Sequence, residues 1–295
     1  MPTVSSKKAV VTLSIAGGGA PTTSQFPDID LRRLLMCGVG LAPAGANVIM
    51  QLSRLSVGHG VAESVVETGA LFRHPLKRTR TTLGYVTVAL LGSDADRVAL
   101  RREVNRQHRL VHSSAQSRVP YNAFDPELQL WVAACMYRGL LDALSVVRAT
   151  PTPSTLDELH WLSSRFATTL QVPAAKWPVD RAAFELYWAK EIDRIEMDDV
   201  TRTYLYGVAS LRFLPAPWRW AFGPLHRVIT TGFLPEPFRR ELHLPWSTSR
   251  ALLFRVVVVT LAGLNRLLPR LLREFPLNLC YWDARRRLSR GLPFV

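Results

Sequence analysis

The chain is patterned mainly for amphipathic helices. Apolar residues recur three and four positions apart over most of the 295 residues, whereas the strict alternation of a half-buried strand is scarce. This pattern predicts one all-α globular domain of about ten helices over residues 28–295. The segments expected to be helical include residues 61–72, 75–91, 93–111, 155–168, 180–197, 198–211, 247–268 and 276–290.

Two stretches interrupt this simple pattern. Residues 35–52 are nearly free of charge and approach the length of a membrane span, but three glycines, a proline and an asparagine favour a buried core helix. Gly58 and Gly60 are expected to separate this helix from the next one. Residues 214–244 are rich in proline and aromatic residues, which predicts short helices and loops.

The helix that begins at Ser93 carries the first candidate for chemistry. A serine followed by two aspartates is typical of a helix start, because short oxygen side chains accept hydrogen bonds from the unpaired N–H groups of the first turn. Val104, His108 and Val111 are spaced to share one face, and four arginines occupy the others. The imidazole of His108 is therefore either a satisfied core histidine or a ligand aimed into a pocket.

The formal charge of +14 is unevenly distributed. Residues 201–295 contain fifteen arginines against four carboxylates, a difference of +11. Such a balance suits an anionic membrane surface, nucleic acid or an anionic ligand, or is simply a solvated basic face. One hypothesis is therefore a non-catalytic basic helical protein that binds a membrane or nucleic acid through this last third, with Arg285–Arg287 as the test residues. No specific nucleic-acid motif accompanies these charges.

Common catalytic and metal-binding motifs are missing from the sequence. It contains no phosphate-binding P-loop, no G-x-S-x-G nucleophile motif and no H-E-x-x-H zinc motif. Cys37, Cys135 and Cys280 are far apart and form no C-x-x-C pair, so we expect three free core thiols. His108 and His112 have a spacing compatible with a metal ion, but a third ligand is missing.

The first 27 residues are expected to form a flexible tail. They contain two lysines, a short apolar run and small residues, which only faintly imitate a secretory signal. We therefore expect a cytoplasmic location, with membrane association through the basic last third as an open alternative.

A series of motifs, in order along the chain, resembles one known family. It is the family that contains the latex clearing protein, a bacterial rubber oxygenase, and the endoplasmic-reticulum oxygenase of mycophenolic acid biosynthesis. The resemblance covers about residues 31–290. The matching stretches are GVAES (60–64), HPLKRTRTTLGYV (74–86), NRQHRLV (105–111), YNAFDPELQLWV (121–132), KWPVDRAAFELYW (176–188), TTGFLPEPFRRELHLPWS (230–247) and LLPRLLREFP (267–276).

The resemblance implies an all-α fold with a globin-like pocket for haem b, and an oxygenase of secondary metabolism. Dioxygen would be the co-substrate and a hydrophobic small molecule the substrate, with cleavage of a carbon–carbon double bond or hydroxylation as the reaction. In this family the histidine of the H-x-x-V pattern binds the iron, which points to His108. Arg78 and Thr82 fall on family positions that line the haem site, and Glu63 falls on the position of a catalytic base.

The chain departs from the family pattern at four places. Ser64 stands where the family commonly has histidine, and Arg54-Leu55 replaces a His-Pro pair. Ala133 replaces the histidine of a Trp-Val-His pattern. Thr81 replaces a lysine of the rubber enzyme. If that lysine caps the iron, we expect an open or water-filled distal position here. These changes bear on the substrate and the reaction more than on the haem.

Overall fold

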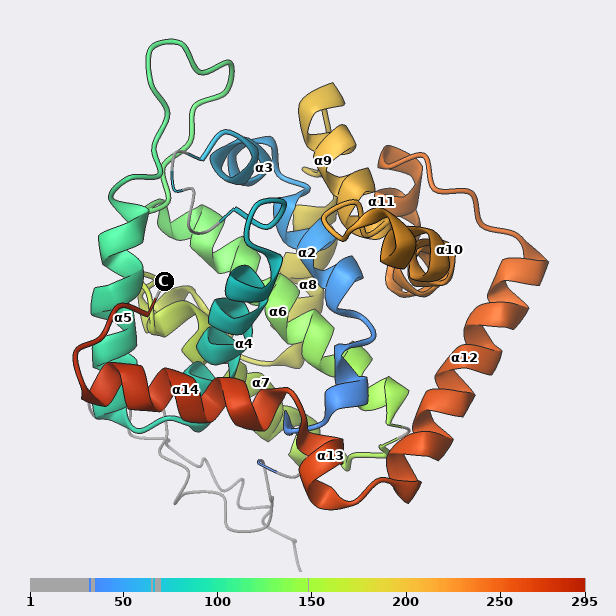
Figure 1. Ribbon diagram of the computed structural model, residues 1–295. Helices are drawn as coiled ribbons and strands as arrows, with labels where there is room; N and C mark the ends of the chain where they lie inside the picture. Colours follow the sequence, from blue (N-terminus) through green and yellow to red (C-terminus); the bar gives the residue numbers. More distant parts are fainter. Residues whose placement is uncertain (1–31, 33–34, 65, 67–69, 148, 295) are drawn as a thin grey trace, which may run out of the picture.

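The computed structural model describes the chain except for residues 1–31, 33–34, 65, 67–69, 148 and 295, so the expected tail lies outside the described residues (Figure 1). The described part forms thirteen α-helices and no strand, which confirms the predicted all-α domain. The helices are α2 (Ala44–Leu52), α3 (Leu55–Ala62), α4 (Pro75–Leu91), α5 (Asp94–His108), α6 (Pro126–Val146), α7 (Pro153–Thr168), α8 (Arg181–Ile192), α9 (Asp199–Ala209), α10 (Ala216–Phe233), α11 (Glu236–Glu241), α12 (Thr248–Leu267), α13 (Arg270–Glu274) and α14 (Leu277–Ser289), with 3-10 turns η2 (Gly38–Leu41) and η4 (Ala174–Lys176).

Helix α6 runs through the middle of the molecule, with α2 and α7 packed against it (Figure 1). Its Trp131 is buried and stacks on Trp188 of α8, with the ring centroids 5.3 Å apart, and on Phe238 of α11 at 6.4 Å. Burying such large rings supplies much of the hydrophobic stabilisation of a core. This aromatic cluster packs against the Trp131 side of α6. Residues on the other side of the helix are left to line a cavity.

Side chains cap the starts of both α5 and α6, and the cap of α5 is the one that the sequence predicts. Ser93 and Asp96 form a reciprocal capping box, in which each side chain accepts a hydrogen bond from the other residue's backbone N–H. Asp125 accepts a hydrogen bond from the backbone N–H of Glu127 at the start of α6. Helix α5 therefore begins where expected, and it ends at His108.

The predicted helix over residues 61–72 is wrong. Helix α3 begins at Leu55 and ends at Ala62, so it runs through both glycines that were expected to break it. Gly58 is needed for close packing, because a Cβ atom there would lie 2.5 Å from Cγ2 of Thr201 on α9. Glu63 consequently caps the end of a helix instead of lying in the first turn of one.

Two other expectations are corrected. Pro43 divides the expected helix over residues 35–52 into η2 and α2. Residues 214–244 contain the eighteen-residue helix α10 with Pro224 inside it, so this segment is far more helical than its prolines predicted. The carbonyl that loses its partner at Pro224 belongs to Trp220, which is solvent-exposed, and water can replace the missing N–H. Over the described residues, no helix has the length and apolarity needed to cross a membrane.

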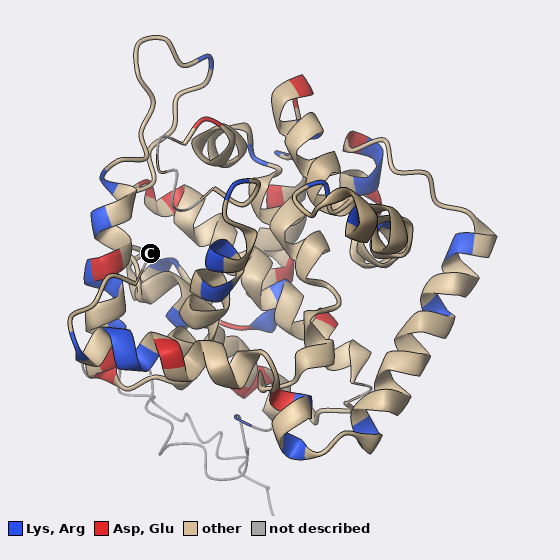
Figure 2. Ribbon diagram, in the orientation of Figure 1, with Lys and Arg blue, Asp and Glu red and all other residues tan. Residues whose placement is uncertain are grey.

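The last helices lie at the periphery. Helix α14 packs along α4, whereas α12 stands at the edge of the molecule, where it meets α10, α6 and η2 (Figure 1). Ala262 is its one buried residue. Arginines recur along α12 without an acidic residue (Figure 2). All three cysteines are free and buried, as the sequence predicts.

Candidate functional site

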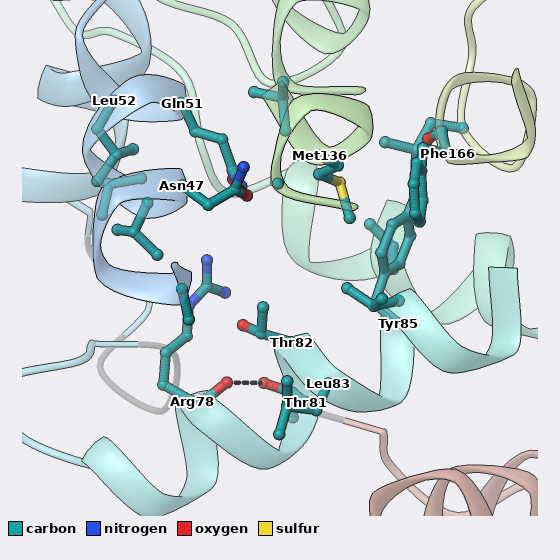
Figure 3. Close-up of a pocket in the computed structure, with 18 of the residues that line it drawn as sticks. Asn47, Gln51, Leu52, Arg78, Thr81, Thr82, Leu83, Tyr85, Met136 and Phe166 are labelled. Carbon is teal, nitrogen blue, oxygen red and sulfur yellow. Dashed lines mark hydrogen bonds between the residues drawn. The ribbon is translucent and has the colours of Figure 1, made fainter. Parts of the chain in front are cut away.

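A cavity of about 440 Å³ lies among α2, α4, α5 and α6. Apolar side chains form most of its wall, and the C-terminal segment adds Leu277 and Phe294. This volume is in the range of pockets that hold a small ligand or a cofactor. Figure 3 shows the part of the wall where Asn47 and Gln51 on α2 face Arg78 and Thr82 on α4 across the cavity.

His108 lies on this wall. Val104, one turn earlier on α5, lines the same cavity, so this part of the predicted helix face meets the cavity. Val111 lines the cavity too, but it lies beyond the end of α5 and not on the helix as predicted. The Nδ1 atom of His108 is buried and has no hydrogen-bond partner among the described residues, and the ring meets the edge of Phe124 at 6.1 Å between centroids. His108 is therefore not a core histidine satisfied by its neighbours.

Burial and the charge of Arg78 lower the pKa of His108 to about 4. At neutral pH its imidazole is thus uncharged. Only the neutral form has a lone pair to offer a metal, so this histidine is held in the protonation state of a ligand.

Arg78 and Thr82 lie one turn apart on α4 and reach the same cavity (Figure 3). No ion pair joins Arg78 to a carboxylate of the described residues, and the residue is part of the cavity wall. Surrounding protein still desolvates the guanidinium enough to lower its pKa. An unpaired cation in a largely apolar cavity favours a ligand with a negative group. Thr81 also lines the cavity, and its hydroxyl donates a hydrogen bond to the carbonyl oxygen of Arg78, 3.0 Å away.

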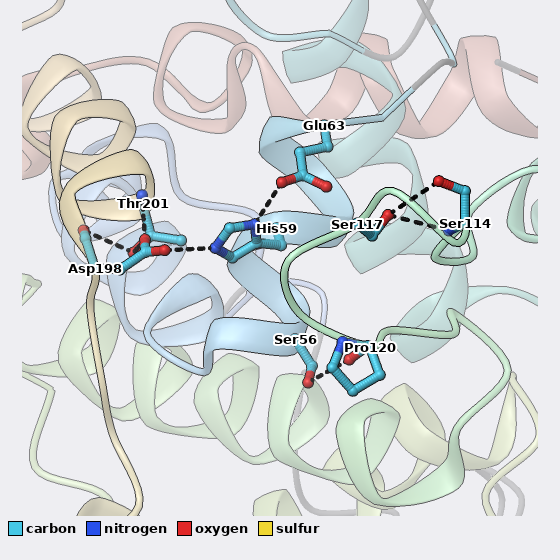
Figure 4. Close-up of polar contacts among 8 residues, drawn as sticks. All are labelled: Ser56, His59, Glu63, Ser114, Ser117, Pro120, Asp198 and Thr201. Carbon is cyan, nitrogen blue, oxygen red and sulfur yellow. Dashed lines mark hydrogen bonds and ion pairs between the residues drawn. The ribbon is translucent and has the colours of Figure 1, made fainter.

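Glu63 lies beside this cavity but is not part of its wall, although Val61 and Ser64 are. Its Oε1 atom is 2.6 Å from Nδ1 of His59 (Figure 4). The other nitrogen, Nε2, is 2.7 Å from Oδ2 of Asp198 at the start of α9. His59 is completely buried, so its imidazole links Glu63 at the end of α3 to Asp198 at the start of α9.

The two carboxylates outweigh the cost of burying His59. Burial alone disfavours the imidazolium, but the hydrogen bonds to Glu63 and Asp198 raise the pKa of His59 above its ordinary value. Burial also opposes the charge of Asp198, yet hydrogen bonds from the Thr201 backbone and from His59 lower its pKa to about 2. The charged form of this cluster therefore stabilises the contact between α3 and α9.

Replacing His59 with glutamine is expected to lower the free energy of unfolding by about 2 kcal/mol, a value reduced because both carboxylates are partly exposed. Since the folded pKa of His59 is raised, its contribution is complete below the ordinary value of 6.5 and is lost as the pH rises through the folded value. Urea unfolding of both proteins at about pH 6 and about pH 9 measures this difference. An equal loss at both pH values would contradict it.

The sequence did not point to His59, nor to the two amide side chains in the cavity wall, Asn47 and Gln51. The spacing of His59 and Glu63, four residues apart, was the available signal, but the flanking glycines suggested a helix boundary at this point. Asn47 donates to the carbonyl of Cys135, and Gln51 donates to Oδ1 of Asn47 at 2.6 Å. These bonds fix the two amides in the cavity wall.

The structure also places His112, the second histidine of the possible metal pair, and Arg54, one of the departures from the family pattern. His112 is exposed, pairs with Asn122 in a single β-bridge and is absent from the cavity wall. In the described part of the chain, no three His, Cys, Asp or Glu side chains gather in a way that could hold a metal ion. Arg54, which replaces a family histidine, lies over Trp131 at 5.1 Å and pairs with Glu191.

Comparisons with known proteins place the chain in a family. Residues 31–263 match the catalytic domain described as "ER-bound oxygenase mpaB/B'/Rubber oxygenase". Two relatives, uncharacterised proteins of Mycobacterium bovis and Mycobacterium tuberculosis, are each 44% identical over 255 residues, which is 86% of this chain and the whole of each relative. No solved structure matches, so the globin-like character stays a prediction. Since the family match spans most of the chain, this protein belongs to the mpaB and rubber oxygenase catalytic-domain family.

Proposed function

We propose that this protein is a haem b oxygenase that uses dioxygen on a hydrophobic small molecule. The observation that carries the proposal is the cavity itself, into which a neutral imidazole and an unpaired guanidinium both project from apolar walls. Membership of an oxygenase family supports an enzyme with oxygen as co-substrate.

The residues present fit a haem group. A haem combines an apolar ring, an iron that needs a neutral nitrogen ligand, and two carboxylates. His108 would supply the nitrogen, Arg78 would pair with a carboxylate, and apolar side chains such as Val104 would cover the ring. When bound, the haem would supply the activation of dioxygen.

The side chains of the chain itself would prepare this reaction. Burial keeps His108 neutral, and the apolar wall excludes water from the reacting groups. Thr82 holds a hydroxyl inside the cavity, one turn from Arg78, where it can hydrogen-bond a polar atom of the ligand (Figure 3). Glu63, fixed by His59 at the edge of the cavity, is the proposed acid or base.

The apolar wall also favours an apolar substrate. A family member is described as a rubber oxygenase, and rubber is a polyisoprenoid. Oxidative cleavage of a double bond and hydroxylation are the two reactions we propose, and their products differ. The haem-loaded protein would be incubated with squalene under ¹⁸O-labelled dioxygen, and the products analysed by mass spectrometry. Label from dioxygen in a cleaved or hydroxylated product supports the proposal, whereas label that enters only from water would overturn it.

Replacing Arg78 with methionine is expected to weaken haem binding by about tenfold, because a charged hydrogen bond to a carboxylate is lost. The same change removes a nearby positive charge and should raise the pKa of His108. Haem titration and NMR titration of the His108 ring measure the two effects. Arg102→Met, at an exposed arginine of α5 outside the cavity wall, is the control. Unchanged haem affinity in Arg78→Met would contradict the assignment of Arg78.

A further inference from the structure

The outer side of α12 is an exposed apolar face. Leu252, Val256, Val259, Leu264 and Leu267 are all exposed, and their spacing places them on one side of the helix. Leu267 is 83% exposed. Leu271 on α13 is exposed as well and follows directly along the chain. We call these six residues the α12–α13 face. Contiguous exposed aliphatic residues of this kind mark an interaction surface.

The opposite side of α12 is the one that packs on the protein. Phe254 lies against Gly232 of α10, and its ring is 4.9 Å from that of Phe233. Asn265 accepts a hydrogen bond from the thiol of Cys37 at 3.2 Å. The six apolar residues of the α12–α13 face each keep half or more of their surface exposed.

Positive charge borders this face. From Leu242 to Arg273 the sequence has five arginines and no carboxylate, and Figure 2 shows α12 with basic residues alone. Arg255 and Arg266 are exposed and flank the apolar residues on the same edge of the helix. The next carboxylate along the chain, Glu274, is buried and pairs with Arg270.

We propose that the α12–α13 face docks the protein on the surface of an anionic phospholipid bilayer. An interfacial helix has this arrangement, with apolar residues that enter the acyl boundary and arginines that meet the anionic headgroups. A second copy of the chain fits less well. A two-fold contact through this face would bring the arginines of one copy against those of the other, with no carboxylate on α12 to neutralise them.

The docking face and the cavity share a supporting element. Cys37, which bonds to Asn265 of α12, lines the cavity together with Gly40 of η2. Gly38 in the same turn lies against the backbone of Phe275, just after α13. Docking would therefore bring this wall of the cavity close to the lipid phase, where apolar molecules dissolve. Delivery of a substrate from lipid rests on the proposed function, but the docking itself does not.

Flotation of the full-length protein with vesicles tests the docking. We expect binding to phosphatidylcholine vesicles that contain phosphatidylglycerol, weak binding to pure phosphatidylcholine, and a decrease as salt is added. The double variant Val256→Glu/Leu267→Glu should bind about tenfold less or worse, because two carboxylates would enter the interface. The double variant Arg255→Gln/Arg266→Gln should bind the vesicles less tightly, and its binding should depend less on salt. Leu186→Glu, at an exposed leucine of α8, is the matched control and should bind like the original protein.

Circular dichroism melting would check that each variant is folded. No vesicle binding by the original protein, or equal binding by Val256→Glu/Leu267→Glu, would overturn the proposal. So would a dimer in sedimentation velocity that Val256→Glu/Leu267→Glu dissociates, since the face would then hold a second copy. None of these measurements needs haem or turnover, so a negative result here leaves the proposed function standing.

Discussion

His108→Ala is expected to lose bound haem and all oxygenase activity. The imidazole of His108 would bind the iron. It lies in the largely apolar cavity wall, where burial keeps it uncharged. Loss of a residue that merely orients a metal ligand costs 10–100-fold in affinity, so loss of the ligand itself should cost about a hundredfold or more. Haem titration followed by the Soret absorption band measures the affinity, and oxygen uptake measures the activity.

Two companion variants sharpen this test. His112→Ala is the control, because His112 is exposed and lies outside the cavity wall. His108→Gly leaves room for a small ligand, and added imidazole should restore the Soret band if the ring binds iron. A His108→Ala protein with an unchanged Soret band and affinity would show that another residue holds the haem.

Glu63→Gln is expected to lower turnover by about a hundredfold without changing the haem content. Glutamine keeps the size of the side chain but cannot take up a proton. The side chain lies next to the cavity residues Val61 and Ser64, and its Oε1 atom is fixed by His59. Steady-state turnover over a range of pH, with haem content measured on the same samples, gives the result.

A purely structural role for Glu63 predicts a loss of stability instead of a loss of turnover. The Glu63→Gln variant would then lose stability, because a neutral amide would face the His59 ring, while turnover per folded molecule stayed normal. His59→Gln provides the comparison, since it leaves the carboxylate of Glu63 in place but removes the side chain that fixes it. Normal turnover together with a lower melting temperature in Glu63→Gln would contradict the catalytic assignment.

Local signals in the sequence predicted much of the helical frame. Helix α5 starts at Ser93 as expected, and Val104 and His108 meet one cavity as their spacing indicated, whereas Val111 lies beyond the helix end. These features depend on residues three or four positions apart, where helix geometry alone decides which side chains are neighbours. The role of His108 as an iron ligand was implied by the family resemblance, and it stays a prediction.

The errors came from contacts that are distant in sequence. Gly58 looked like a helix boundary, but its missing Cβ makes room for Thr201 on α9, more than 140 residues later. Pro224 looked like a break, yet the helix continues around it. The apolar residues of α12 gave no sign of whether they face the core or the outside, because periodicity identifies a face and not its partner. His59 was missed since its second carboxylate comes from α9.

A haem titration of the purified protein tests whether this cavity binds one haem through His108. We expect a Soret band that saturates at one haem per chain. The ferrous form should show the iron–imidazole stretching band in its resonance Raman spectrum, and His108→Gly should lack that band. Binding that does not saturate, or a ferrous spectrum without the iron–imidazole band in the original protein, would contradict the claim.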